Sequence, residues 1–401
     1  MNRSAPRTTA QRVGLWLGLG LFLAMLWLPV PAGFEVPAWR TAALAAGPLL
    51  GIVPVEQAGS GYGSSTIFLI LGGCLLALAL ERWQLHRRIA YLIVTRAGTS
   101  ARGLVLGVMA ATAFVSVWVS NTSTTLMMLP VVIVLAVAYA ATIGGLATLI
   151  GTPTNALAVA FLEQTYGVRP TFAEWLIFGL PCSIVMLVGA WWVLVAITHP
   201  FRWPDIAQAR ELVQSELRSL GRLSAPERRV AAIGVAAAVA WVTSPWLKAL
   251  PGLGALSDMG IAMLAGLALF LVPSGVPRGG TLLEAGDFRR LPWDTLFLSG
   301  GGLALASLIQ DSGLSVHIGE LLGGVAGWPP LAVTAVVVLV VPAAVAASCA
   351  FMLPVGTAPN AIVFGSGRVQ GRDMLRAGIW VNILGWGVII AVSAATLRWL
   401  A

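Results

Sequence analysis

The sequence has little charge. Only 10% of its 401 residues are charged, 58% are hydrophobic, and the mean hydropathy is +0.88. A soluble globular protein carries roughly 25% charged residues, so this chain has too few to cover a water-facing surface of its size. The scarcity excludes a soluble fold and a disordered tail. It predicts an integral membrane protein, whose apolar runs are long enough for helices rather than barrel strands.

Cysteine is scarce as well. Cys74, Cys182 and Cys349 stand far apart within apolar stretches, and an odd, scattered set argues against a disulfide framework. The His-Glu-x-x-His pair of zinc proteases is missing. No histidine falls in the middle of an apolar run, where it could activate a serine such as Ser366 as a nucleophile. We therefore expect no enzymatic activity.

Acidic residues are fewer than basic ones, 16 against 24, and the net charge is +8. In a soluble protein this excess would suggest nucleic acid as a partner. Here the basic residues stand in the loops between apolar runs, which is the pattern of cytoplasmic loops. We therefore expect the lipid bilayer, and no nucleic acid, as the partner of this chain.

Three arginines, Arg3, Arg7 and Arg12, precede an apolar run over residues 13–30. A signal peptide would also begin this way, but the run is long for one and many further spans follow. The sequence therefore predicts a first transmembrane helix with a cytoplasmic N-terminus.

Further apolar runs fall at 41–55, 66–80, 103–119, 124–150, 175–198, 230–247, 259–273, 295–309, 331–355 and 377–399. Together they predict an all-α polytopic membrane protein with about 9–11 membrane segments. Several runs are shorter than a full crossing and are interrupted by Gly and Pro. Such segments are typical of the broken or re-entrant helices of secondary transporters.

One long polar stretch, residues 199–229, is rich in arginine. Leu212, Leu217 and Leu220 give it a weak apolar stripe, which indicates an interfacial cytoplasmic helix that links two halves of the chain. A solvated basic loop is the alternative, and the sequence does not decide between them.

Two pairs of segments recur in the same order. Residues 65–73 resemble residues 294–302, and residues 151–156 resemble residues 356–361. In transporters such duplicated halves are commonly inverted across the membrane, with the binding site at their interface. The two recurring segments are closer together in the second half than in the first, so the second half is shortened. The predicted organisation is scaffold helices (1–60), a first repeat (61–198), the linker (199–229) and a second repeat (230–401).

The most polar part of the membrane region is residues 116–125, which hold six hydroxyl groups and Asn121 without a single charge. One or two hydroxyl groups can bond to the preceding helical turn, but a run of six with an amide is hard to explain as packing. Hydroxyl and carboxamide oxygens suit a small cation such as Na⁺, and their hydrogens suit an anion.

Two further segments, residues 143–156 and 352–361, combine Gly with Pro in apolar surroundings. Pro153 removes a backbone donor and disfavours helical geometry at Thr152. An unwound stretch at membrane depth is tolerated only where it is buried in protein or lines a cavity. It offers carbonyl groups to a cation and a helix N-terminus to an anion.

With these motifs the sequence resembles the divalent anion:sodium symporters, which carry dicarboxylates, citrate or, in some members, sulfate. The resemblance rests on Ser120-Asn121-Thr122 and on residues 143–156 and 346–367, and it covers most of the chain. It implies a homodimer of inverted repeats that works as an elevator, with a re-entrant hairpin and a broken helix in each half. It also implies Na⁺-coupled symport in the bacterial inner membrane.

The resemblance implies the site residues too. The substrate would contact four side chains, those of Asn121, Thr122, Thr152 and Thr357. The sodium ligands would be Ser116, Ser120, Asn121 and the carbonyl group of Gly151 at a first site, and the carbonyl group of Gly356 at a second. No arginine falls in these motifs, so neutral donors, helix dipoles and bound cations would hold the anion.

The chain departs from the family at the second hairpin tip. The family has a second Ser-Asn-Thr tip, which would fall within residues 333–346, and this stretch holds neither Ser nor Asn. A second shortening follows the first tip, where residues 131–143 leave about 20 Å of helix for a return arm and a new helix. Natural trimming or internal deletion would produce such a chain. The alternative function is a transport-impaired or uncoupled relative, such as an anion exchanger or a channel-like protein.

Overall fold

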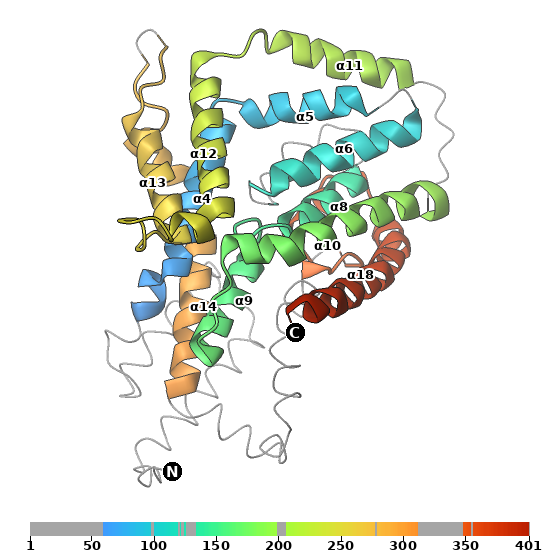
Figure 1. Cartoon of the computed structure of the whole chain (residues 1–401). Coiled ribbons are helices and arrows are strands. Elements are labelled where there is room, and N and C mark those ends of the chain that lie inside the picture. The colour runs from blue at the N-terminus through green and yellow to red at the C-terminus, as the bar shows by residue number, and fades with distance from the viewer. Residues whose placement is uncertain are drawn as a thin grey trace, which may run out of the picture. The chain divides into compact units, whose positions relative to one another are not determined.

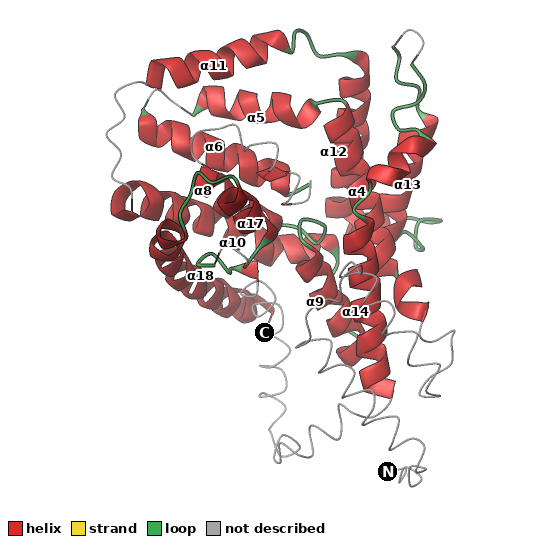
Figure 2. Cartoon of the chain, turned by 180° about the vertical axis from the view of Figure 1, so that it is seen from behind, coloured by secondary structure: helices red, strands yellow, loops and turns green. Residues whose placement is uncertain are grey.

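The structure is a computed structural model of the chain. It describes residues 59–97, 100–118, 121, 124–125, 134–198, 206–276, 279–311, 348–353 and 356–400. Among these residues every regular element is helical (Figure 2). Pro273 and Thr281 form one isolated antiparallel bridge. The all-α prediction is confirmed for this part of the chain. The predicted helices at 13–30 and 41–55, and the stretch 333–346, lie outside it.

Figure 1 labels the described α-helices except α17, which is labelled in Figure 2. Their bounds are α4 Ser65–Arg82, α5 Leu85–Arg96, α6 Ala101–Ser116, α8 Val134–Gly145, α9 Pro153–Tyr166, α10 Phe172–Trp192, α11 Ile206–Ser219, α12 Ala225–Leu247, α13 Asp258–Leu271, α14 Trp293–Asp311, α17 Ala358–Gly365 and α18 Gly371–Leu400. Three short elements accompany them: the 3₁₀ turns η1 Ser60–Gly63 and η3 Ala285–Arg290, and a π-helical turn, η2 Val193–Thr198, that continues α10.

Four of the described helices are long and apolar enough to cross a membrane, at Ser65–Arg82, Phe172–Thr198, Ala225–Leu247 and Gly371–Val392. Shorter apolar helices stand at Ala101–Ser116, Val134–Gly145, Asp258–Leu271 and Thr295–Ala304. The chain is thus a multi-pass membrane protein. The shorter helices fall below the ~20 residues of a full crossing, in agreement with the predicted interrupted segments.

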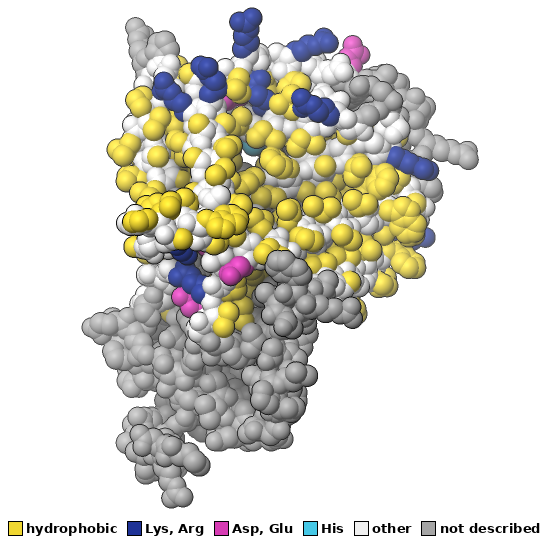
Figure 3. All heavy atoms as spheres, viewed as in Figure 1, with side chains coloured by type: hydrophobic (Ala, Val, Ile, Leu, Met, Phe, Trp, Pro, Cys, Tyr) yellow, Lys and Arg dark blue, Asp and Glu magenta, His cyan; other side chains and the backbone are white. Residues whose placement is uncertain are grey.

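Helix α10 is apolar on both of its faces. Trp175, Cys182 and Met186 are buried against the core, whereas Ile177 and Ile184 are more than half exposed. Figure 3 shows apolar side chains spread over this outer face, with Lys and Arg gathered near α5, α11 and the start of α12. A helix that is hydrophobic all round is typical of a membrane span, so the outer face of α10 suits lipid.

The described residues fall into two compact units. The smaller one combines η1 with the start of α4, the end of α9, and α14. Two glycines allow close packing there, because a Cβ on Gly300 would overlap the ring of Tyr62 and a Cβ on Gly61 would overlap the backbone of Ala304. The similar segments 65–73 and 294–302 both lie at the start of a helix, α4 and α14.

The larger unit contains α6, α8, α10 and α18, which lie side by side (Figures 1 and 2). Every residue of α8 is buried. Its neighbours approach closely because it is rich in small residues: a Cβ on Gly144 would overlap the backbone of Ala113 in α6. The first predicted helix break therefore begins at the end of a fully buried helix.

The linker contains helix α11, so the loop alternative is wrong for residues 206–219. Val213 of α11 packs against an apolar cluster that includes Ala90 and Val94 of α5. Helix α11 thus lies on α5, while its place at the membrane surface and its cytoplasmic side stay predictions.

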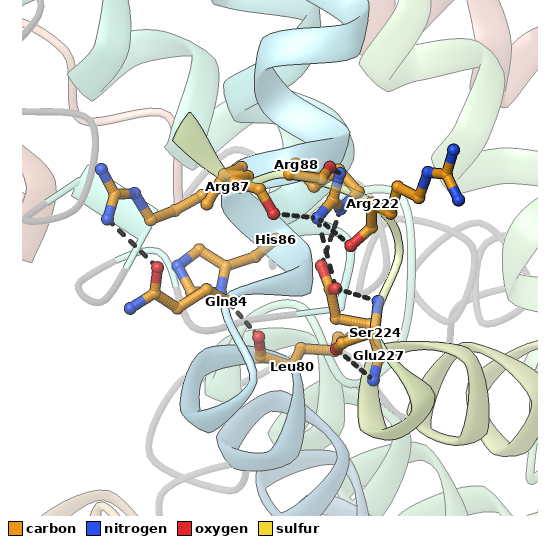
Figure 4. Close-up of polar contacts among 10 residues, drawn as sticks. Leu80, Gln84, His86, Arg87, Arg88, Arg222, Ser224 and Glu227 are labelled. Carbon is orange, nitrogen blue, oxygen red and sulfur yellow. Dashed lines mark hydrogen bonds and ion pairs between the residues drawn. The ribbon is translucent and has the colours of Figure 1, made fainter. Parts of the chain in front are cut away.

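Arg88 of α5 ties this helix to the end of the linker (Figure 4). It is buried, its Nε donates to Glu227 Oε1 at 2.7 Å, and its two Nη groups donate to the carbonyl oxygens of Leu220 and Gly221, each at 2.9 Å. Glu227 also accepts from the backbone N of Ser224 at 2.7 Å, which closes the N-cap of α12. One arginine thus holds together three segments of the larger unit.

His86 stands two residues earlier, at the start of α5. Its side chain is buried, and its Nδ1 lies 2.7 Å from the carbonyl oxygen of Leu80. Burial lowers the pKa of His86, so the ring is neutral at pH 7. Because a carbonyl oxygen only accepts, Nδ1 carries the proton and donates.

Replacing Arg88 with Met is expected to destabilise the fold strongly. Glu227 would stay buried without its partner, and removing one side of a buried ion pair costs about 3–5 kcal/mol. Arg87→Met is the matched control, because the pair of Arg87 with Glu216 is partly exposed and such pairs contribute about 0–1 kcal/mol. Thermal unfolding in detergent measures both variants, and equal losses would contradict the assigned role of Arg88.

Candidate functional site

The first helix break separates α8, which ends at Gly145, from α9, which begins at Pro153. Pro153 occupies the first helical position, where its missing N–H costs nothing. Thr152 precedes it, and Thr152 Oγ1 accepts from the backbone N of Asn155 at 3.4 Å, as an N-cap does. The sequence signals of Gly and Pro therefore act as predicted.

The turn inside the break is held by Thr148. Its Oγ1 donates to the carbonyl oxygen of Val117 at 2.8 Å and accepts from the backbone N of Gly151 at 3.1 Å. The side chain of Asn155 also reaches back across the turn, and its Nδ2 donates to the carbonyl oxygens of Gly145 at 3.0 Å and Thr148 at 2.8 Å. The unwound backbone is thus fixed by one side chain inside the break and one from the helix that follows it.

Gly145 is the point at which the predicted ligands meet. A Cβ on Gly145 would overlap the side-chain carboxamide of Asn121 and Cγ2 of Thr152. A Cβ on Gly151 would in turn overlap the carbonyl oxygen of Gly145. The close approach needs glycine at both positions, and it brings Asn121, Gly151 and Thr152 around one backbone residue.

Ser116, at the end of α6, joins this group. Its Oγ is buried and lies 2.6 Å from Asn121 Oδ1 and 2.8 Å from the carbonyl oxygen of Ala141. A hydroxyl group has one hydrogen, so it satisfies only one of these two oxygens. The result is a cluster of neutral oxygens at the end of α8, to which Ala141 contributes a backbone group that the sequence did not indicate.

The cluster is made of oxygens alone. In the part of the chain that the structure describes, no group of His, Cys, Asp and Glu is placed to hold a metal ion. Neutral hydroxyl, amide and carbonyl oxygens suit hard cations rather than transition metals. Ser120 and Thr122, the other predicted ligands of this tip, lie outside the described residues.

The second break repeats the first in its local geometry. Thr357 caps α17 by accepting from the backbone N of Asn360 at 3.4 Å. Asn360 Nδ2 donates to the carbonyl oxygens of Ala350 at 2.9 Å and Leu353 at 3.1 Å, 10 and 7 residues earlier. Asn155 bonds at the same two separations. A Cβ on Gly356 would overlap the carbonyl oxygen of Ala350, just as one on Gly151 would overlap that of Gly145.

The two breaks are joined through α8. Helix α17 packs against α8 (Figure 2). The hydroxyl of Tyr139, in the middle of α8, lies 3.1 Å from the carbonyl oxygens of both Phe351 and Met374, and its ring packs against that of Phe351 at 5.0 Å. Sequence reasoning gave Tyr139 no role, because a lone tyrosine in an apolar run carries no motif.

Interrupted helices that expose capped N-termini and oxygen ligands inside an apolar, helical chain are characteristic of secondary transporters. A family model described as "Citrate transporter" matches residues 22–343, and one described as "Sodium:sulfate symporter transmembrane region" matches residues 330–401. The chain belongs to the divalent anion:sodium symporter family. Its matches are transporters rather than enzymes, as the sequence predicted.

Curated relatives agree with this assignment. The sodium-dependent dicarboxylate transporter SdcS of Staphylococcus aureus strain COL is 33% identical over 446 aligned positions, which cover 94% of this chain and 85% of the relative. SdcS of strain MRSA252 is 34% identical over 479 positions, which cover 97% of this chain and 92% of the relative. Both alignments have more positions than the chain has residues, so the relatives contain segments that this chain lacks. This agrees with the shortening inferred from the sequence.

Gly145→Ala tests the cluster. The added methyl group would displace Asn121 and Thr152, so any stabilisation by Na⁺ should be lost. In the unchanged protein this stabilisation is expected to follow the ratio of [Na⁺] to Kd, about 2.7 kcal/mol at a hundredfold excess. Melting temperatures in NaCl and in choline chloride measure it.

Gly234→Ala is the control for this test, because a Cβ at Gly234 of α12 meets no atom of the described chain within 4 Å. It should leave the response to Na⁺ intact. A Gly145→Ala variant that responds to Na⁺ like the unchanged protein would show that the cluster is not the cation site.

Proposed function

We propose that the protein is a secondary active transporter that couples Na⁺ to the symport of divalent anions, dicarboxylates such as succinate or else citrate or sulfate, across a bacterial inner membrane. The observation that carries the proposal is the oxygen cluster of Ser116, Asn121 and Ala141 beside the first helix break. The two relatives are sodium-dependent dicarboxylate transporters, which supports the same coupling ion and class of substrate.

The first sodium ion would bind at the end of α8. Ser116, Ser120 and Asn121 would supply side-chain oxygens and Gly151 a carbonyl oxygen. Ser116 now has one hydrogen for two acceptor oxygens, and a cation among the three would offset the repulsion that remains. A second ion would use the carbonyl group of Gly356, whose turn has the same geometry as that of Gly151.

The anion would sit between the two breaks, against Asn121, Thr122, Thr152 and Thr357. The N-termini of two helices, α9 and α17, border the breaks, and such termini attract anions. The sequence of both breaks contains no Lys or Arg. The charge of a dianion would therefore be balanced by the bound sodium ions, so that each ligand raises the affinity for the other. This mutual dependence is the physical basis of symport.

The larger assembly is part of the same proposal. The matching geometry around Asn155 and Asn360 supports a duplicated half. From the family membership we also propose that the two halves are inverted, that the protein is a homodimer, and that it works by an elevator motion. We also propose a cytoplasmic N-terminus, because arginines precede residue 13.

An uncoupled or transport-impaired relative is the second candidate. It is favoured by the missing Ser-Asn-Thr tip and by alignments that are longer than the chain. Each donor lost to a charged ligand weakens binding by about 1.5–3 kcal/mol. Two lost donors would lower the affinity for the anion by roughly two to four orders of magnitude.

Uptake of labelled succinate into proteoliposomes tests the proposal. An inward Na⁺ gradient should drive accumulation above that in choline chloride, and the affinity should be far below that of SdcS measured side by side. Accumulation that needs no Na⁺ gradient, but needs succinate inside, would favour an exchanger instead. Micromolar affinity would contradict the view that both tips are required.

Restoring the missing tip gives a separate prediction. A Ser-Asn-Thr hairpin inserted between Leu339 and Val345 should raise Na⁺-dependent uptake, because it returns the lost donors to the anion. An insertion of equal length with Ala-Ala-Ala at its tip is the control. If both insertions give the same uptake, the donors of the second tip do not limit transport in this chain.

A further inference from the structure

Asn155 and Asn360 are completely buried and hold the two breaks in the same way. Each uses both hydrogens of its carboxamide nitrogen, one on the carbonyl oxygen 10 residues earlier and one on the carbonyl oxygen 7 residues earlier. The four distances lie between 2.8 and 3.1 Å. The donor capacity of both side chains is therefore fully used.

In each break one of the two accepting carbonyl groups also accepts a backbone N–H of the turn: Thr148 from Gly151 N at 3.4 Å, and Leu353 from Gly356 N at 3.0 Å. The other accepting carbonyl group lies three residues earlier. Gly145 is the last residue of α8, and a helix end has several carbonyl groups with no partner within the helix. Asn155, from the first turn of α9, supplies a hydrogen to Gly145 at this helix end and a further one to Thr148 inside the turn. The side chain thus bridges from the second half-helix to the first.

The oxygen of each carboxamide has no hydrogen-bond partner among the described residues, although it is buried. An unsatisfied buried acceptor is unfavourable, and its presence calls for a reason. The two hydrogens of each asparagine thus bridge the break, while its oxygen adds no bond there. An aspartate would have the same shape but would lack those hydrogens.

Asn155 fixes the positions of the proposed cation ligands. It fixes Gly145, against which Asn121, Thr152 and Gly151 pack at distances that leave no room for a Cβ. A shift of Gly145 relative to Thr148 would therefore move these groups with respect to Ser116. In the second break Asn360 holds Ala350, whose carbonyl oxygen is in close contact with Gly356 in the same manner.

We propose that Asn155 and Asn360 are a matched pair of positioning residues, each of which bridges one helix break and thereby sets the affinity of the adjacent site for Na⁺. The inference rests on the proposed Na⁺ coupling and adds to it two residues that do not touch the ion. Neither side chain can reach the ion with its nitrogen, because both hydrogens face carbonyl oxygens.

The test compares Asn155→Asp, Asn360→Asp and the milder Asn155→Ser, which keeps one donor and serves if the aspartate variants do not fold. Ser183→Ala is the matched control. Ser183 donates to the carbonyl oxygen of Ile143 at 2.9 Å, so its loss removes a buried hydrogen bond to α8 that does not cross the break. Two quantities are measured for each protein, the NaCl concentration at half-maximal thermal stabilisation and the hydrogen exchange of residues 146–152 and 351–357.

We expect Asn155→Asp to raise the NaCl midpoint about tenfold and to speed exchange in residues 146–152 alone. Asn360→Asp should speed exchange in residues 351–357 alone, and Asn155→Ser should lie between Asn155→Asp and the unchanged protein. Ser183→Ala should lower the melting temperature without changing the NaCl midpoint or either exchange rate.

Faster exchange with an unchanged NaCl midpoint would reduce the asparagines to a structural role and overturn the proposal. Unchanged exchange in the aspartate or serine variants would show that the breaks do not depend on them. If the unchanged protein shows no response to NaCl, the proposed function fails and the link to affinity fails with it. The exchange data then still decide whether the asparagines bridge the breaks.

Discussion

A carbonyl group without a donor is costly inside an apolar medium, and the structure around the first break follows from this constraint. Where α8 stops at Gly145, side chains donate to the nearby carbonyl oxygens: Asn155 to those of Gly145 and Thr148, and Trp175 to that of Leu146. Such replacements are what allow irregular backbone at membrane depth. Glycine is needed wherever a second backbone or a carboxamide must come close. The proposed ion site therefore lies where side chains replace the hydrogen bonds of an interrupted helix.

The charged side chains lie away from the two helix breaks. The ion pairs of the described residues stand at helix ends and in the connections, as with Arg88 and Glu227, Arg82 and Glu284 at 3.0 Å, or Arg290 and Glu81 at 3.0 Å. The breaks themselves are neutral. A fixed arginine would bind the anion whether or not sodium is present. In a neutral site, bound sodium ions must balance the charge of the anion. Neutrality is thus a condition of coupling rather than a lack of binding groups.

The sequence predicted most of the site's side chains, but few of the backbone groups that contact them. The helical class, the two breaks and the convergence of Ser116, Asn121, Gly151 and Thr152 follow from composition, from Gly and Pro, and from the resemblance. The carbonyl group of Ala141 could not be found, because a backbone oxygen has no sequence signature and its partner Ser116 is 25 residues away. The pairing of Arg88 was equally hidden, since a charge between two apolar runs carries no sign of its partner. Asn155 and Asn360 were visible as part of the repeat, but their bonds depend on how the chain turns back.

The hydroxyl of Tyr139 has a consequence for how the chain is made. Its two neighbouring carbonyl groups belong to Phe351 and Met374, which are 212 and 235 residues further along. A polypeptide is inserted into the membrane from its N-terminus, so α8 enters the bilayer long before either partner has been synthesised. Until then the phenol is a polar group in apolar surroundings without its final acceptors. Helix α8 therefore reaches its native packing only after residues 351–374 have been translated.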